Sequence, residues 1–252
     1  MIALLLALAA IQSALQPVPV SDEAAYASCA AKAKADPQAA IAIANEWLVR
    51  GGGIYARQCL GLAYTGMERW PAAATAFEQA AQSAESAQDP RRGDFWVQAG
   101  NGWLAAGDAG KARKAFDAAL ATPAMAAELR GEVHFDRARA AVLANDLAGA
   151  RADIDQGLKL VPADPFGWYL SSALALKEGR LARAQDDIAQ ALQLAPDDAN
   201  LLVHAGNVAG VSGEHDAARG LYAKAIGAAP QSEAAKAARA ALGANAVAAQ
   251  SR

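Results

Sequence analysis

Residues 165–198 read PFGWYLSSALALKEGRLARAQDDIAQALQLAPDD, and residues 199–230 read ANLLVHAGNVAGVSGEHDAARGLYAKAIGAAP. The two stretches align without a gap, and seven pairs of residues recur 34 positions apart: Trp168 and Leu202, Ser172 and Gly206, Gly179 and Gly213, Ala184 and Ala218, Ile188 and Tyr222, Ala191 and Ala225, Pro196 and Pro230. A fixed period of this length, with small residues where helices cross and Gly or Pro where they end, is typical of a stacked helix-turn-helix repeat.

The same spacing continues toward the N-terminus. One unit contains His134, Ala138, Asn145, Ala150, Ile154 and Pro162; an earlier one contains Trp96, Gly100, Trp103, Gly107, Ala112, Phe116 and Ala119; the first contains Leu60, Gly61, Tyr64, Ala73, Phe77 and Ala80. At these residues the chain resembles the tetratricopeptide repeat (TPR) family, whose pattern has Trp, Leu-Gly and Tyr on the first helix and Ala, Phe, Ala and Pro on and after the second.

This resemblance implies an all-α fold, a right-handed superhelical solenoid of antiparallel helix hairpins. Five repeats are expected within residues 53–230, at about 54–87, 93–126, 131–164, 165–198 and 199–232. In a solenoid each repeat contacts only its neighbours, so a chain of 252 residues can form one elongated domain.

Both ends of the chain depart from the repeat. Residues 1–16 are uncharged and apolar as far as Gln12, which predicts a secretory signal peptide; a misassigned start codon or an apolar first helix is the alternative. The apolar run is too short for an integral membrane span. Residues 17–52 predict an atypical helical hairpin, and residues 231–252 a polar capping helix with a tail. The predicted location is the periplasm or cell envelope of a bacterium, with the cytoplasm as the alternative.

Composition and charge narrow the class of partner. A formal net charge of -3, with scattered Lys and Arg, gives no general attraction to nucleic acid or to an anionic membrane surface. Cys29 and Cys59 fall on the first helices of adjacent predicted hairpins, and an exported chain meets an oxidising compartment. The two cysteines are therefore a candidate disulfide, and two separate buried thiols are the alternative.

The sequence contains no recognisable catalytic or metal-binding motif. His134, His204 and His215 have no HxxxH or HExxH spacing, and with the two cysteines they make no metal-ligand pattern. The acidic pair Asp186 and Asp187 is interpreted as part of a solvated helix face. We therefore expect neither enzymatic activity nor a cofactor or metal.

The TPR resemblance implies that the first helices line a concave groove that holds a peptide. The groove residues expected from the repeat phase are Tyr55, Gln58, Asn101, Phe135, Arg139, Phe166, Tyr169 and Asn207. Aromatic side chains such as Phe135 and Tyr169 are expected to anchor an apolar segment, while Asn101, Arg139 and Asn207 fix its orientation. The predicted function is a non-catalytic protein- or peptide-binding scaffold. A structural homo-oligomer is the first alternative, and an envelope hydrolase that uses unrecognised groups is the second.

Overall fold

The computed structural model describes residues 22–123 and 125–250, and this part of the chain folds into thirteen α-helices without a β-strand. The helices are α1 (Asp22–Ala35), α2 (Pro37–Val49), α3 (Gly53–Gly66), α4 (Trp70–Ser86), α5 (Arg92–Ala105), α6 (Ala109–Leu120), α7 (Ala127–Leu143), α8 (Leu147–Leu160), α9 (Pro165–Lys177), α10 (Leu181–Leu194), α11 (Ala199–Val211), α12 (His215–Ala228) and α13 (Glu233–Gln250). The predicted signal peptide, residues 1–16, lies outside the described residues.

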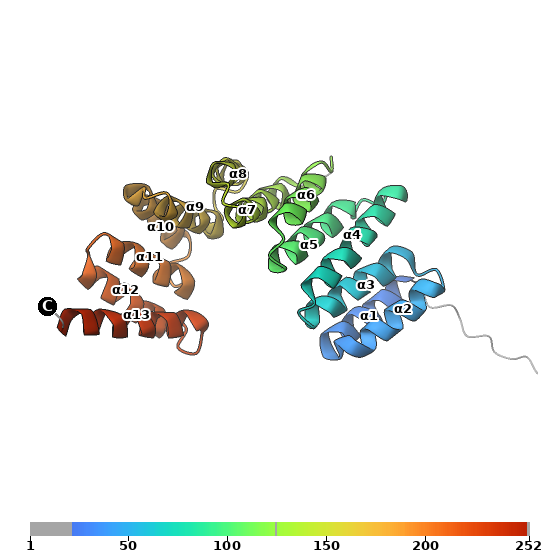
Figure 1. Cartoon of the computed structure of the whole chain (residues 1–252), viewed down its shortest axis with the longest axis horizontal. Helices are drawn as coiled ribbons and strands as arrows, with labels where there is room; N and C mark the ends of the chain where they lie inside the picture. The colour runs from blue at the N-terminus through green and yellow to red at the C-terminus, as the bar shows by residue number, and fades with distance from the viewer. Residues whose placement is uncertain (1–21, 124, 251–252) are drawn as a thin grey trace, which may run out of the picture.

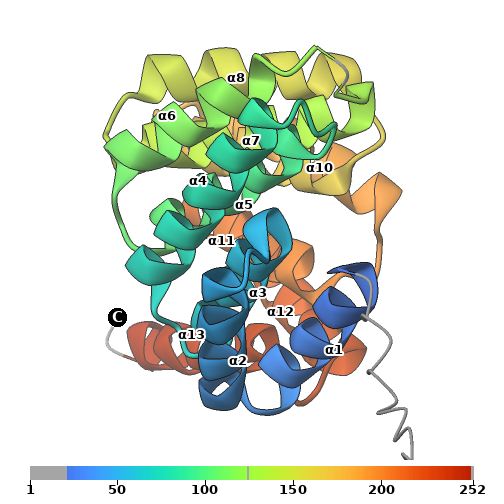
Figure 2. The ribbon, with the colours of Figure 1, turned by 90° about the vertical axis from the view of Figure 1, so that its right-hand side faces the viewer.

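Consecutive helices pair as antiparallel hairpins that stack along a curved path, which confirms the predicted all-α solenoid. Figure 1 shows an arch in which α7 and α8 form the crown, α1 to α4 one limb and α11 to α13 the other. The side view in Figure 2 looks onto the limb that contains α2 and α3. Each of the five expected repeat ranges corresponds to one hairpin, from α3–α4 to α11–α12, although α7 begins at Ala127, four residues before its expected range. The last helix, α13, packs against α11 and α12 at the end of the stack.

The turn inside each of these five hairpins reverses the chain through one left-handed residue. Gly107, Gly179 and Gly213 have φ angles of 77°, 73° and 82°, and Asn145 has a φ of 60°. In the first of the five, Glu68 adopts a φ of 56°, although its side chain makes this conformation unfavourable. All five turns contain the same backbone hydrogen bond, for example from Arg69 N to Tyr64 O at 2.9 Å, so the glutamate does not alter the turn.

Each hairpin closes where a side chain of its second helix lies on a small residue of its first. In three hairpins this residue is a glycine under an aromatic ring: Gly61 under Phe77, Gly100 under Phe116, and Gly206 under Tyr222. A Cβ atom at Gly61, Gly100 or Gly206 would lie only 2.4–2.5 Å from the ring. In the other two hairpins the first helix has Ala138 or Ser172, and the second has the smaller Ile154 or Ile188. The two positions therefore vary together in size.

A disulfide joins the N-terminal hairpin to the first repeat. Cys29 of α1 and Cys59 of α3 are bonded, with their Cα atoms 6.0 Å apart, and both are buried. The bond closes a separation of 30 residues, which corresponds to about 3.5 kcal/mol of stabilisation in the chain-entropy model. The terminal hairpin, which has a repeat on one side only, is therefore held covalently.

The glycine contact can be tested within one helix, because α11 contains two glycines in different surroundings. Gly206→Leu should clash with Tyr222 and lower the free energy of unfolding by about 1 to 3 kcal/mol. Gly210→Ala is the matched control: a Cβ there meets nothing within 4 Å, so it should stabilise the helix by up to about 1 kcal/mol. Urea unfolding followed by circular dichroism measures both, and equal effects from the two changes would contradict this account of the crossing.

Candidate peptide-binding groove

The first helices of the repeats carry the predicted groove residues, and α9 presents the most accessible aromatic pair among them. Phe166 is 41% exposed, and its ring stacks on that of Tyr169, with centroids 6.0 Å apart and planes 23° apart. Phe166 and Tyr169 line a hollow of about 280 Å³, whose opposite side is formed by Asn200 and Leu201 of α11. Aromatic rings that are stacked yet open to solvent are well suited to anchor an apolar segment.

The prediction of Phe135 as a groove anchor is wrong. Its side chain is 1% exposed and points into the core between α8 and α9. The ring fits there because Gly157 and Gly167 have no side chains. A Cβ atom at either position would lie 2.3 Å from the Phe135 ring. The ring also meets Phe166 edge to face at 6.5 Å, so Phe135 supports the exposed aromatic pair from below.

At the N-terminal end of the predicted groove, the ring of Tyr55 is already covered by other side chains of the molecule. The guanidinium of Arg91 lies over the Tyr55 ring at 4.5 Å, and the ring of Tyr26 lies 5.6 Å away. Asp89 holds Arg91 in place through bonds to Nε at 3.0 Å and Nη2 at 2.6 Å. Gln58, on the same helix as Tyr55, has a buried Oε1 without a hydrogen-bond partner. Tyr55 therefore packs within the molecule and is a poor candidate for an anchor.

The three residues that were predicted to orient a peptide, Asn101, Arg139 and Asn207, differ in how many of their polar atoms are free to bind it. Asn101, half-buried on α5, makes no side-chain hydrogen bond with another described residue. Arg139 forms an ion pair with Asp136 one turn earlier on α7, with Nη1 and Oδ1 2.8 Å apart. Asn207 accepts a hydrogen bond from the hydroxyl of Tyr222 at 2.8 Å through Oδ1. The amide nitrogen of Asn207 donates to no other residue that the structure describes, and the side chain is exposed.

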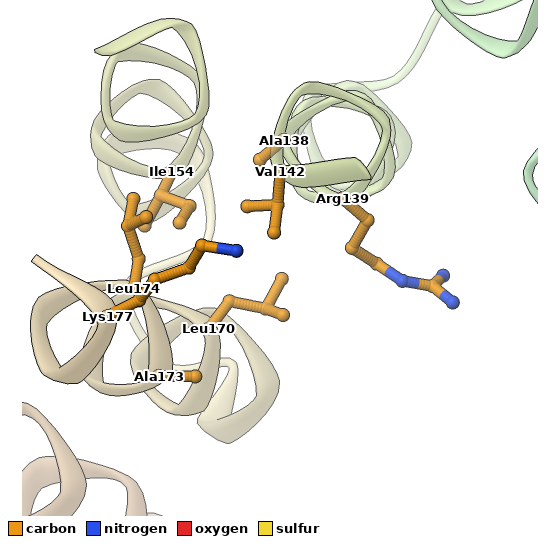
Figure 3. A pocket seen from close by; sticks show the side chains of 8 residues that line it. All are labelled: Ala138, Arg139, Val142, Ile154, Leu170, Ala173, Leu174 and Lys177. Carbon is orange, nitrogen blue, oxygen red and sulfur yellow. The ribbon is translucent and has the colours of Figure 1, made fainter. Parts of the chain in front are cut away.

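A cavity of about 320 Å³ lies between α7 and α9, beside the aromatic pair. Ala138, Arg139, Val142, Ile154, Leu170, Ala173, Leu174 and Lys177 line it. Figure 3 shows Val142 and Leu170 facing each other across the space, with the amino group of Lys177 reaching in from α9 and Arg139 pointing away. Its volume is at the lower end of the range for ligand sites, so it fits one or two side chains.

A serine and a histidine lie together beside the groove without forming a nucleophile and its base. Ser172 Oγ lies 3.0 Å from His204 Nε2, but the hydroxyl donates to the carbonyl of Ala184 at 2.7 Å. The imidazole must then donate to Ser172, and burial lowers the pKa of His204, which favours the neutral ring. Ser172 is fully buried, so a substrate cannot reach it.

Buried polar contacts that the sequence analysis missed join α9 to the second helices on either side of it, α8 and α10. Asp187, expected on a solvated face, is 6% exposed and accepts a hydrogen bond from Ser171 at 2.5 Å. Arg151 donates to Ser171 at 2.7 Å and to Glu178 at 3.1 Å, which joins α8 to α9. The repeat phase gives no signal for these contacts, because their partners come from three different helices.

A second ionic group joins α8 to α7. His134 Nδ1 and Arg137 Nη2 both lie within 2.9 Å of Asp153 Oδ1. Burial raises the pKa of Asp153, but the hydrogen bonds from His134 and Arg137 outweigh it and hold that pKa below its usual range. This carboxylate therefore stays ionised and paired.

Among residues 22–123 and 125–250 there is no group of three His, Cys, Asp or Glu side chains arranged to hold a metal ion. No described helix is both long and apolar enough to cross a bilayer.

Comparison with family models and with curated proteins gave no match. Solved structures do match. PilW, described as a widely conserved type IV pilus biogenesis factor, is 16% identical with a TM-score of 0.70, covering 86% of this chain and 97% of PilW. A tetratricopeptide repeat protein from Parabacteroides merdae is 15% identical with a TM-score of 0.64, covering 88% of this chain and 85% of that protein. YrrB, a TPR protein with an unusual peptide-binding site, is 17% identical with a TM-score of 0.51, covering 73% of this chain and 90% of YrrB. The chain therefore has the TPR fold.

The buried His204 should make stability depend on pH. Because its pKa is lower in the folded state than in the unfolded chain, its contribution is complete above about pH 6.5 and is lost as the pH falls below that value. Urea midpoints at pH 7.5 and 5.5 should differ less for His204→Gln than for the parent. His215→Gln, at the exposed start of α12, should keep the parent's difference. Equal pH dependence in the parent and His204→Gln would contradict the assignment.

Proposed function

We propose that this chain is a non-catalytic scaffold of the bacterial cell envelope that binds an apolar segment of a partner protein in its groove. The stacked pair of the exposed Phe166 and the half-buried Tyr169 carries the proposal, because these two adjacent aromatic rings lie beside an apolar cavity. Such anchors typically dominate the affinity of an interface. Phe166 replaces Phe135 as the first anchor, whereas Tyr169 keeps its predicted role.

The polar residues around these anchors suit an extended peptide. Asn101, Arg139 and Asn207 lie on three first helices, and each has at least one donor that can bind a peptide carbonyl. A preformed groove of this kind needs little rearrangement on binding, which lowers the entropic cost. YrrB, which shares the fold, is described as having a peptide-binding site.

Two features support location in the envelope. The Cys29–Cys59 disulfide is typical of chains that fold in an oxidising compartment. The uncharged, apolar residues 1–16 match the hydrophobic region of a signal peptide. PilW, which shares the fold, is described as a type IV pilus biogenesis factor.

The anchors can be tested by a double substitution. Phe166→Ala together with Tyr169→Ala should weaken capture of the partner by about two decades or more, since hot-spot aromatics contribute about 2 kcal/mol or more each. The partner is first captured from envelope extract by the immobilised protein and identified by mass spectrometry. Its affinity for the parent and for the double variant is then measured with purified components.

Phe116→Ala is the matched control for this test, because Phe116 is fully buried in a core cluster that includes neither Phe166 nor Tyr169. It should lower the free energy of unfolding by about 3 to 5 kcal/mol, because it empties a filled core site, while the folded variant keeps its groove surface. Unchanged partner affinity in the double variant would show that Phe166 and Tyr169 are only packing residues. A parent that light scattering shows to be a dimer, and a double variant that is a monomer, would show that a second copy closes the groove.

Export and the disulfide can be tested together on protein made in a bacterium. The mature chain recovered from the periplasm should begin near residues 10–20, as predicted for signal-peptide cleavage. It should also contain no free thiol until reductant is added. N-terminal sequencing and alkylation followed by mass spectrometry give both results, and an intact Met1 with two thiols alkylated at once would contradict both expectations.

A further inference from the structure

The cavity between α7 and α9 lies beside a hairpin whose second helix has a smaller core residue than two earlier repeats. In two earlier repeats a phenylalanine of the second helix, Phe77 or Phe116, fills the hairpin, whereas the third repeat has the smaller Ile154. The aromatic ring of that repeat, Phe135, is turned away into the core between α8 and α9. The space on the groove side therefore remains open, and its walls are apolar.

The charges around this cavity are unbalanced. Its lining includes two cations, Lys177 and Arg139, and no carboxylate. Arg139 is paired with Asp136, whereas the amino group of Lys177 forms no ion pair with another described residue. The adjacent Glu178 does not neutralise it, because that carboxylate binds Arg151 at 3.1 Å. Lys177 is an exposed residue in the last turn of α9, and its unpaired ammonium at the edge of an apolar hollow attracts an anion attached to an apolar group.

We propose that this cavity recognises an acidic and apolar segment of the partner protein. An apolar side chain of the segment enters between Val142 and Leu170, and the carboxylate of a neighbouring Asp or Glu binds the amino group of Lys177. The inference rests on the proposed function and narrows its ligand from any apolar peptide to one with a negative charge at a defined place.

The face of α9 also sets a distance along the segment. Phe166, Leu170, Ala173 and Lys177 follow helical spacing on one face, and the first and last lie about 16 Å apart along the axis. An extended peptide covers that distance with about five residues. The favoured segment therefore has an aromatic or aliphatic residue for the Phe166–Tyr169 pair about five positions from its acidic and apolar pair.

The probe is a blocked, fluorescein-labelled peptide of Gly and Ser that carries one Leu-Glu pair and one Phe about five residues away. Fluorescence anisotropy measures its binding to the full chain, and matched probes carry Gln or Lys in place of Glu. Lys177→Glu should weaken the Glu probe about tenfold or more and should strengthen the Lys probe. Lys159→Glu is the control, because Lys159 is exposed in the last turn of α8 and does not line the cavity; it should leave binding unchanged.

A second variant tests the cavity itself. Ala173→Phe should fill the space and weaken binding of the Glu probe about tenfold or more without lowering the melting temperature.

Equal affinity for the Glu and Gln probes would overturn the inference, and so would a Kd of the parent for the Glu probe above about 1 mM. If equal affinity is accompanied by weaker binding to the Phe166→Ala, Tyr169→Ala variant, the peptide-binding function stands and only charge recognition fails. Displacement of the probe by decanoate at a lower concentration than by unlabelled peptide would assign the cavity to an amphiphile and overturn the inference.

Discussion

The contact between a buried side chain of the second helix, which is an aromatic ring in three of the five hairpins, and a small residue of the first is the constraint on which the solenoid depends. Phe116 covers Gly100 so closely that a Cβ would lie 2.4 Å from the ring, and the ring is fully buried. Burying such a side chain contributes about 1.5 to 3 kcal/mol, and the close approach also sets the angle at which the two helices cross. Because each hairpin packs on the next, the crossing angle within the hairpins determines how successive repeats are oriented and thus how the solenoid curves.

The third repeat shows how this constraint can be relaxed without loss of the fold. Its first helix has Ala138, which leaves less room than a glycine, and its second helix compensates with Ile154. An aromatic ring is retained, but it comes from the first helix: Phe135 occupies the space left by Gly157 and Gly167. Phe135 thus fills the core between α8 and α9, while the smaller Ile154 and Ala138 line a cavity on the groove side of the same repeat.

The periodicity of the sequence was enough to predict the fold, since small and aromatic residues return at the same phase in several hairpins. Single positions within the groove were less predictable. The repeat phase places Phe135 on the groove, and only the glycines at positions 157 and 167, one on each neighbouring helix, could have indicated a hole in the core large enough for a ring. Asp187 was misjudged for a related reason: its hydrogen-bond donor Ser171 lies on another helix and is itself bound by Arg151 of a third, and periodicity within one helix cannot show such contacts.

The buried ion pairs explain why the groove can be rigid although its core is built from small residues. Asp153 of α8 pairs with Arg137 of α7. Arg151 of α8 pairs with Glu178 at the end of α9 and donates a hydrogen bond to Ser171, so both walls of the cavity are bound to the one helix behind them. Separating the helices would leave each charge buried without its partner, which is energetically costly, so each ion pair opposes that separation. The distance between α7 and α9 is thus set from behind the groove, and a peptide that enters it meets walls that are already in place.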